Sequence, residues 1–223
     1  MRNTLNVCTD SILTKFRANH QLWFGVALAL SLGVSSVGVC GGGLQVQQVV
    51  QQVVEQVKAE PFPQLSGLDL VRGGLVRVKV RQARLGTVVV FLSMRCPCSA
   101  SHQSILNQLS QRFTPLGFQF IGVHSNADEE AVAAGEYFRK SGLIFPVIQD
   151  NKSKIADTLG AFKTPHVFVL NPEGEVLFQG GVDNSHVALA AQRHYLRDAL
   201  ALIVEGKKPA QKEVRVLGCE IRR

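Results

Sequence analysis

Between residues 65 and 223, short apolar runs alternate with segments in which apolar residues recur at helical spacing. The β-branched run at 88–93 predicts a buried strand, and the apolar spacing over 99–113 predicts a helix directly after it. Before this pair, the pattern predicts an alternating strand segment at 65–80 with a turn at Gly73-Gly74. After it, the pattern predicts a strand at 118–124, a helix from 128 to about 140, an extended piece at 145–148 and a short helix at 152–159. The last predicted elements are a hairpin of strands at 166–170 and 175–179 and a helix at about 187–204. This order indicates an α/β fold in which helices flank both faces of a mixed sheet.

The N-terminal segment has a different pattern, a polar leader followed by a long apolar run. Lys15 and Arg17 lie near the end of the leader, and residues 22–39 are almost free of polar side chains. A positive flank before such a run is typical of an export signal or a membrane anchor. We therefore assign residues 1–40 to a signal peptide or membrane anchor and predict a periplasmic or other extracytoplasmic location, with the chain anchored to the membrane. Four interpretations stay open: lipidation at Cys40, an uncleaved transmembrane segment, simple signal cleavage, and a buried core helix that only resembles a signal.

Residues 41–64 are predicted to be a linker and spacer helix. Gly41 to Gly43 form a flexible joint, and the valines at 46, 50, 53 and 57 then follow at the spacing of one helix face. A spacer helix is favoured over a dimerising coiled coil, because two heptads are few for a stable coil. The pattern does not define an oligomeric state.

Composition limits the domain count and the classes of partner. The 223 residues, 46% of them hydrophobic, suit one medium domain, which we assign to 65–206, followed by a C-terminal tail at 207–223. The net charge is +7, but the basic residues are scattered and form no long stripe with aromatic residues, which argues against nucleic acid as a partner. Five cysteines are too few and too unevenly placed for a disulfide scaffold, so they indicate redox or metal chemistry.

The strand at 88–93 ends three residues before the motif Cys96-Pro97-Cys98. Pro97 has no N–H and suits the first helical turn, which places Cys96 at the cap position. There the free backbone N–H groups and the positive end of the helix dipole favour a thiolate and lower the pKa of the thiol. Because the thiolate is the reactive form, the motif predicts that Cys96 is a nucleophile.

Several stretches resemble a known family. They are FLSMRCPCSASH at 91–102, GVHSN at 122–126, FPVIQD at 145–150, TPHVFVLNPEG at 164–174 and GCEI at 218–221. Together they resemble the thioredoxin fold, and more closely the redoxin group that includes the alkyl hydroperoxide reductase/thiol-specific antioxidant (AhpC/TSA) family. The resemblance implies an enzyme, a thiol–disulfide oxidoreductase without a cofactor, whose partners are protein thiols or disulfides. It also implies that Cys96 is the attacking cysteine and that Thr164-Pro165 forms a cis-proline loop that faces Cys96 and binds the substrate peptide.

The second cysteine departs from the Cys-x-x-Cys pattern of thioredoxins. Ser99 occupies the expected position, and the nearest thiol is Cys98. A disulfide between Cys96 and Cys98 would close a tight ring, so it would be strained and oxidising. Cys219 is the other candidate, because the C-terminal tail could fold back onto the site. Both Cys98 and Cys219 are therefore retained as catalytic candidates for resolving a mixed disulfide.

Two other functions are compatible with the same region. In a thiol-dependent peroxidase, Ser93 and Arg95 would polarise a peroxide beside Cys96. In a copper-binding thiol protein, Cys96, Cys98 and His102 would supply soft donors for Cu(I). Helical geometry does not clearly bring these three donors together, and no second Cys/His pair completes a zinc site, so no metal ligand is assigned.

The remaining polar residues near the motif are expected to be structural. His102 is predicted to lie at the surface or near the helix cap. His166 is predicted to begin a strand, and the alternative is that it approaches Cys96 and helps to stabilise a thiolate. Asp183 and His186 are predicted to lie in a solvated turn. The acidic residues at 128–130 are expected to open a helix, because negative charge is favourable at a helix N-terminus.

Overall fold

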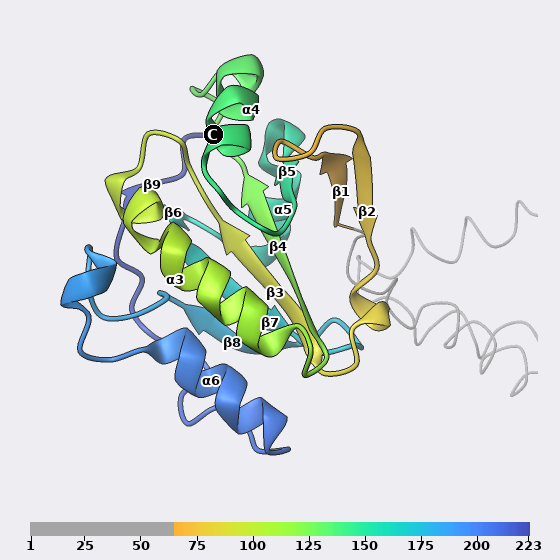
Figure 1. Ribbon diagram of the computed structural model, residues 1–223, viewed down its shortest axis with the longest axis vertical. Helices are drawn as coiled ribbons and strands as arrows, with labels where there is room; N and C mark the ends of the chain where they lie inside the picture. The colour runs from red at the N-terminus through yellow and green to blue at the C-terminus, as the bar shows by residue number, and fades with distance from the viewer. Residues whose placement is uncertain (1–64) are drawn as a thin grey trace, which may run out of the picture. The chain divides into compact units, whose positions relative to one another are not determined.

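A computed structural model of the chain describes residues 65–223 (Figure 1). The strands are β1 (Leu65–Leu68), β2 (Leu75–Val78), β3 (Gly86–Phe91), β4 (Phe118–His124), β5 (Val147–Gln149), β6 (Lys163–Thr164), β7 (His166–Leu170), β8 (Val176–Gly180) and β9 (Cys219–Glu220). The α-helices are α3 (Pro97–Phe113), α4 (Ala131–Lys140), α5 (Lys154–Leu159) and α6 (Tyr195–Val204). The 3-10 helices are η1 (Val80–Gln82), η2 (Asn151–Ser153) and η3 (Ala188–Ala190). The signal or anchor and the spacer helix that the sequence predicts lie in residues 1–64, outside the described residues. From residue 65 onward, no helix combines the length and the apolar character that a bilayer crossing requires.

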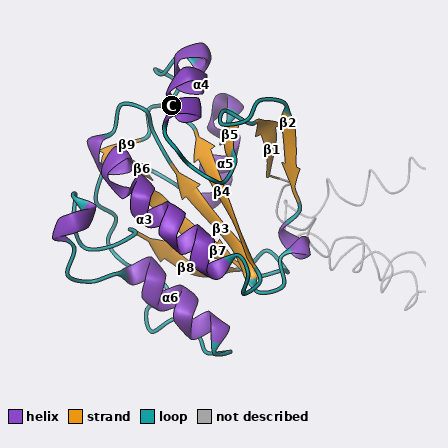
Figure 2. Cartoon of the chain, in the orientation of Figure 1, coloured by secondary structure: helices purple, strands orange, loops and turns teal. Residues whose placement is uncertain are grey.

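A five-stranded mixed sheet in the order β5-β4-β3-β7-β8 forms the centre of these residues (Figure 1, Figure 2). β3 pairs in parallel with β4 and antiparallel with β7. All six residues of β3 are buried, as expected for a central strand made of a continuous β-branched run. The predicted turn at Gly73-Gly74 joins β1 and β2, which form a separate antiparallel pair.

The two faces of β3 belong to two hydrophobic cores. Val88 and Val90 pack in one core with apolar residues of α3, α4 and α6. Val89 and Phe91 pack in the other, which includes residues of α5 and Ile221 near the C-terminus. Alternate residues of β3 thus face the two cores, with α3, α4 and α6 contributing to one and α5 to the other. The predicted α/β architecture is confirmed.

Most predicted elements are present, with small shifts at their ends. The strands predicted at 118–124 and 166–170 have the predicted limits, and the helix predicted at 99–113 begins two residues earlier, at Pro97. The short helix predicted at 152–159 is divided into η2 and α5, because the backbone takes positive φ values at its start.

The helix predicted from the acidic residues 128–130 begins later than expected. α4 starts at Ala131, with Glu130 as its cap residue. Glu129 does not face solvent at the helix N-terminus but is buried. The prediction was wrong at this end because Glu129 makes hydrogen bonds with the segment before α3, which are described below.

The last helix also begins later than predicted. α6 starts at Tyr195, and the residues from 187 onward form η3 and irregular chain before it. The apolar periodicity was misleading at its first position, since Leu189 is 95% exposed whereas Leu196 and Leu200 are fully buried. Asn184 holds this irregular segment, since its side-chain oxygen accepts hydrogen bonds from the backbone N–H groups of residues 192 and 193.

The C-terminal residues fold back onto the domain. Glu213 bridges to Gln179 of β8, and β9 pairs antiparallel with β6, so that Cys219 lies opposite Thr164. Ile221 is buried in one of the two cores. The tail thus returns to the loop before β7, which is the arrangement that would allow Cys219 to reach the Cys96 region (Figure 1).

Candidate active site

Cys96 lies between the end of β3 and the start of α3. It is the N-cap residue of α3, with φ −89° and ψ 112°, and Pro97 is the first residue of the helix. The side chain is buried, and its Sγ lies 2.9 Å from the carbonyl oxygen of Thr164. The cap position predicted from Pro97 is therefore present, and the sulfur faces the loop that precedes β7.

The loop opposite Cys96 is built by Thr164-Pro165. Their peptide bond is cis, and Thr164 pairs with Cys219 through the β6–β9 ladder. The Thr164 carbonyl is positioned to accept the S–H of a protonated Cys96. The buried Thr164 hydroxyl has no other partner among residues 65–223, so it is free to donate to the Cys96 thiolate.

Three thiols converge at this point. The Sγ atoms of Cys96, Cys98 and Cys219 all lie within 4.8 Å of one another, and none of the three is in a disulfide. Two of them come from the start of α3, and the third comes from β9. The structure therefore brings all three cysteines that the sequence analysis selected into one site, together with Thr164. We refer to these three sulfurs as the thiol cluster.

Cys96 is the most acidic thiol of the cluster. Burial acts to raise its pKa, but hydrogen bonds from the Cys219 thiol, the Thr164 side chain and the backbone N–H groups of Ser99 and Cys219 outweigh burial and lower the pKa to about 7. The N–H of Ser99 is one of the free groups in the first turn of α3. A substantial fraction of Cys96 is therefore thiolate at neutral pH.

The other two thiols shift in the opposite direction. Burial, followed by the nearby Cys96 charge, raises the pKa of Cys98. Burial and donation to Cys96 raise the pKa of Cys219 to about 12. Cys219 as a residue is exposed, but its sulfur is directed toward the other two. Cys96 is therefore the thiol of the cluster that ionises first, while the raised pKa values of Cys98 and Cys219 keep these two thiols protonated at neutral pH.

A buried histidine–carboxylate pair supports the Cys98 side of the cluster. His102 is 1% exposed, with Nε2 3.1 Å from Asp183 Oδ2 and Nδ1 2.7 Å from the Cys98 carbonyl oxygen. Since a carbonyl only accepts, Nδ1 carries a proton. The predictions of a surface His102 and a solvated Asp183 were wrong, because the loop that carries Asp183 folds over the start of α3. His186 in this loop is exposed, and its Nδ1 lies 3.4 Å from Cys98 Sγ.

Glu129 anchors the segment that leads into Cys96. Its carboxylate accepts hydrogen bonds from the Ser93 hydroxyl, the Met94 N–H and His124 Nε2, the last two at 2.9 and 2.8 Å. Burial acts to raise the pKa of Glu129, but these donors outweigh burial and lower it. Sequence reasoning missed this cluster. Its only sequence signal is a histidine at a strand end with an acidic residue five positions later.

The residues of the peroxidase alternative are engaged elsewhere. The Ser93 hydroxyl donates to Glu129. The Arg95 guanidinium is exposed and lies 3.8 Å from the Asp128 carboxylate. The contacts of these two side chains therefore give the peroxidase alternative no added support.

His166 begins β7, as the sequence predicts. Its ring packs on Phe162 and Phe168, with centroid distances of 5.1 and 4.4 Å. Burial lowers the pKa of His166 to about 4, so the ring is neutral at pH 7. Phe168 belongs to the core on the sheet face opposite α3, and His166 therefore supplies no positive charge to the thiol cluster.

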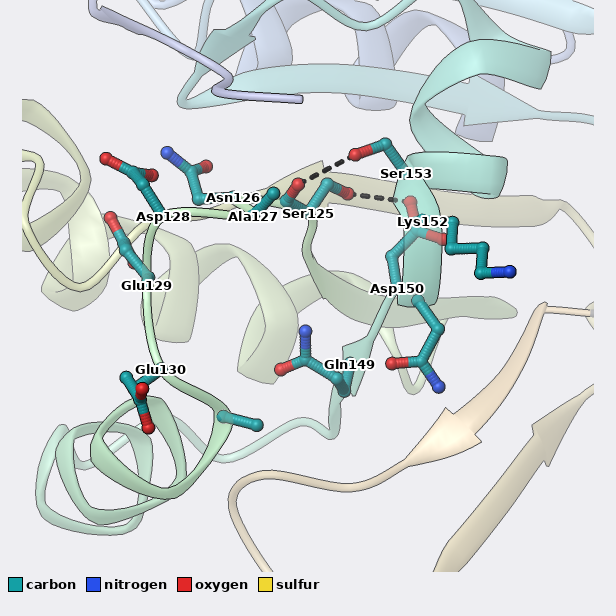
Figure 3. A pocket seen from close by; sticks show the side chains of 12 residues that line it. Ser125, Asn126, Ala127, Asp128, Glu129, Glu130, Gln149, Asp150, Lys152 and Ser153 are labelled. Carbon is teal, nitrogen blue, oxygen red and sulfur yellow. Dashed lines mark hydrogen bonds between the residues drawn. The ribbon is translucent and has the colours of Figure 1, made fainter.

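A polar hollow of about 440 Å³ opens beyond the ends of β4 and β5, lined by residues 125–131 and 149–153 (Figure 3). Its two walls are cross-linked by Ser125 Oγ, which donates to Asp150 Oδ2 at 2.8 Å, and by Ser153 Oγ, which donates to the Ser125 carbonyl at 2.9 Å. No cysteine lines this hollow in the described part of the chain. It is therefore separate from the thiol cluster, although Glu129 contributes to its wall.

The mixed sheet, the cysteine at the start of α3 and the cis-proline loop facing it define a thioredoxin-like protein. A family model described as Redoxin matches residues 57–193, and the chain belongs to the Redoxin family. This confirms the resemblance predicted from the sequence. The chain is also 23% identical over 151 residues to the thiol-disulfide oxidoreductase ResA of Bacillus subtilis (strain 168), in an alignment that covers 67% of this chain and 82% of that protein.

Solved structures support the same fold. An uncharacterized conserved protein from Geobacillus kaustophilus matches with a TM-score of 0.65 and 22% identity over 74% of this chain and 90% of that chain. A putative thiol:disulfide interchange protein DsbE from Chlorobium tepidum matches with a TM-score of 0.50 and 20% identity over 67% of this chain and 96% of that chain. The thioredoxin-like sheet flanked by helices is thus shared with proteins of very different sequence.

Proposed function

We propose that the chain is a thiol–disulfide oxidoreductase in which the Cys96 thiolate attacks a disulfide of a partner protein. The observation that carries the proposal is the environment of Cys96, which lies at the cap of α3, faces the cis-proline loop and has a pKa lowered to about 7. An oxidoreductase activity is supported by membership of the Redoxin family and by the name of the Bacillus subtilis relative. A thiolate that exists at neutral pH is what thiol–disulfide exchange requires.

The reaction consists of two displacements. The Cys96 thiolate attacks one sulfur of the partner disulfide, a mixed disulfide forms, and the second partner sulfur leaves as a thiolate. Another thiol of the cluster then loses its proton and attacks the Cys96 sulfur, which releases the partner as a dithiol and leaves an intramolecular disulfide. The partner gains two electrons and the cluster loses two. The reverse sequence oxidises a partner dithiol.

We assign the second displacement to Cys219. Cys98 is separated from Cys96 by Pro97 alone, whose φ is fixed, and a bond between them would distort the first turn of α3. Cys219 approaches from a different strand, so a bond to it closes no small ring. When Cys96 enters the mixed disulfide, its charge no longer raises the pKa of Cys219, and the proton of Cys219 becomes easier to remove.

Thr164 and Pro165 are the substrate-binding residues of this proposal. Their loop presents backbone groups next to Cys96, where an extended peptide of the partner would lie beside the attacked sulfur. The partners are protein thiols or disulfides. We place the activity outside the cytoplasm, at the membrane, because of the apolar run at 22–39 that follows a basic flank. Protease accessibility of the chain in intact spheroplasts tests the location, and full protection would contradict it.

The central test is exchange by the full chain, purified in detergent, with Cys8 and Cys40 replaced by serine in every variant. Reduction of a disulfide-bonded peptide is followed by mass spectrometry. Cys96→Ser is expected to lower the rate by at least about 1,000-fold, because no other thiol of the cluster ionises near neutral pH. Cys98→Ser is the matched control, since it removes a thiol from the same helical turn, and it is expected to keep the rate within about threefold. Full activity of Cys96→Ser would overturn the proposal.

A further inference from the structure

The thiol cluster has the composition of a soft-metal site. Three Sγ atoms lie within 4.8 Å of one another, and no carboxylate or imidazole belongs to the group. Each sulfur is held by structure: Cys96 by the helix cap, Cys98 by the first turn of α3, and Cys219 by the ladder with Thr164. An ion placed among the three sulfurs would therefore meet donors that are already close together.

Sequence reasoning grouped a different third donor with Cys96 and Cys98. It considered His102, but both ring nitrogens of His102 are engaged, one by Asp183 and the other by the Cys98 carbonyl. The imidazole is therefore turned away from the sulfurs. Cys219 takes its place, because the C-terminal strand returns to the loop before β7.

The number and the type of donors select the metal. Thiolates prefer Cu(I), zinc and iron–sulfur clusters, whereas oxygen ligands suit harder cations. Structural zinc sites take four protein ligands, and iron–sulfur clusters take four cysteines. Within residues 65–223, the thiol cluster offers three sulfur ligands. His186 approaches Cys98 Sγ, at 3.4 Å, but is not within the same reach of all three sulfurs. Three sulfurs and no fourth ligand suit Cu(I).

We propose that the reduced chain binds one Cu(I) ion between the Sγ atoms of Cys96, Cys98 and Cys219. Binding forms three copper–sulfur bonds and releases the protons of the thiols that are still protonated, and no electron is transferred. The exposure of Cys219 gives the ion a route from solvent. A copper-bound Cys96 sulfur is no longer a free thiolate nucleophile, so copper binding and thiol–disulfide exchange exclude each other. The site needs only reduced thiols and does not depend on the exchange proposal.

The test is anaerobic titration of the full reduced chain, carrying Cys8→Ser and Cys40→Ser, with Cu(I) in competition with a chromophoric Cu(I) chelator. One ion per chain is expected. Cys96→Ser, Cys98→Ser and Cys219→Ser are each expected to weaken binding by at least about 100-fold, because even outer-shell changes weaken metal sites by 10–100-fold. His186→Ala is the comparison variant, because it removes a group that contacts Cys98 Sγ from outside the three sulfurs, and it is expected to weaken binding by about 10-fold, less than the loss of any of the three sulfurs.

Two outcomes would overturn the copper site. One is an unchanged affinity in Cys219→Ser, which would mean that the two cysteines of α3 bind the ion alone. The other is a loss in His186→Ala as large as in the cysteine variants, together with tight Zn²⁺ binding, which would indicate a four-ligand zinc site. X-ray absorption of the copper-loaded parent chain provides a measurement without substitutions, and it is expected to show three sulfur neighbours and no nitrogen.

Discussion

Cys98 and Cys219 both place a sulfur within 4.8 Å of Cys96 Sγ, but different parts of the molecule hold them there. Cys98 belongs to the same helical turn as Cys96, and the buried pair of His102 and Asp183 fixes that turn against a loop of the domain. Cys219 is held by a two-residue ladder with β6, close to the end of the chain.

The difference separates a rigid thiol from a movable one. The Cys98 side rests on helix geometry and on the buried hydrogen-bonded pair of His102 and Asp183, both of which resist displacement. Cys219 and Glu220 are exposed and pair only with the two residues of β6, whereas the chain directly after them is anchored by the buried Ile221. Segments with few buried contacts open at low free-energy cost. A thiol that has to move toward Cys96 to form a disulfide is therefore better placed on β9 than on α3.

The largest expected effect shows which of the two thiols, Cys98 or Cys219, resolves the mixed disulfide. In Cys219→Ser, the mixed disulfide between Cys96 and a peptide is expected to persist, with its resolution slowed by about 100-fold, because the nearby attacking thiol is lost. In Cys98→Ser, resolution is expected to stay within about threefold of the parent. Quenched single-turnover reactions analysed by mass spectrometry measure both rates. The opposite ranking of the two variants would assign the step to Cys98.

The next effect concerns the support of the Cys98 side. Asp183→Ala leaves a buried His102 without its carboxylate and is expected to lower the free energy of unfolding by about 3 kcal/mol, the usual range for one partner of a buried pair. Urea unfolding followed by circular dichroism measures it. Asp198→Ala is the control, because it breaks an exposed pair with Arg197 and is expected to cost less than about 0.5 kcal/mol. Equal losses in the two variants would contradict a structural role for Asp183.

A smaller effect is expected where β9 approaches the cis-proline loop. Gly218 has a φ of +148°, and a Cβ there would collide with the Thr164 carbonyl oxygen. Gly218→Ala is therefore expected to move Cys219 away from Cys96 and slow mixed-disulfide resolution by about 10-fold. Gly206→Ala is the control: its φ is +72° but a Cβ meets open space, so only the fold should lose stability. Resolution slowed equally in both would exclude a specific role for Gly218.

The smallest effect is a change in the titration of Cys96. Its alkylation rate by iodoacetamide is expected to rise with pH around a midpoint near 7, because the thiolate is the reacting form. Cys219→Ala removes a hydrogen-bond donor to that thiolate, so the midpoint should move upward. Cys98→Ala removes a contact that is not among the main causes of the lowered Cys96 pKa, and the midpoint should move less than in Cys219→Ala. An upward shift in the Cys98 variant alone would reverse the assignment of the stabilising thiol.

Local patterns in the sequence were sufficient to predict the sheet, α3 and the position of Cys96 at the helix cap. The β-branched run of β3 is buried on both faces of the sheet. Helix α3 begins at Pro97, directly after the cap residue Cys96. These features depend on neighbours within one or two turns of chain, so the sequence carries them directly. The cysteines and the loop at Thr164 were also selected from the sequence, and the structure brings them together.

The features that were missed depend on contacts between distant segments. Asp183 pairs with His102 across 81 positions, and Glu129 binds Ser93 across 36. An acidic residue near a helix start is usually solvated, so the local pattern predicted that Glu129 would cap α4. The buried donors around it are visible only after β4 and the segment before α3 are packed together. The same reason explains the late start of α6, because Asn184 holds the preceding segment in an irregular path.

The ladder between β6 and β9 also has a consequence for the size of molecule that can reach Cys96. The backbone of Thr164, which would receive an extended polypeptide, is already paired with residues of the chain's own end. Those residues belong to the same chain, so their competition for the Thr164 backbone does not depend on the concentration of another molecule. A low-molecular-weight disulfide needs no strand pairing and would avoid this competition, whereas a protein client that pairs with Thr164 would first have to displace β9. Under the proposed function, the ladder would therefore favour short clients over long ones before any sulfur reacts.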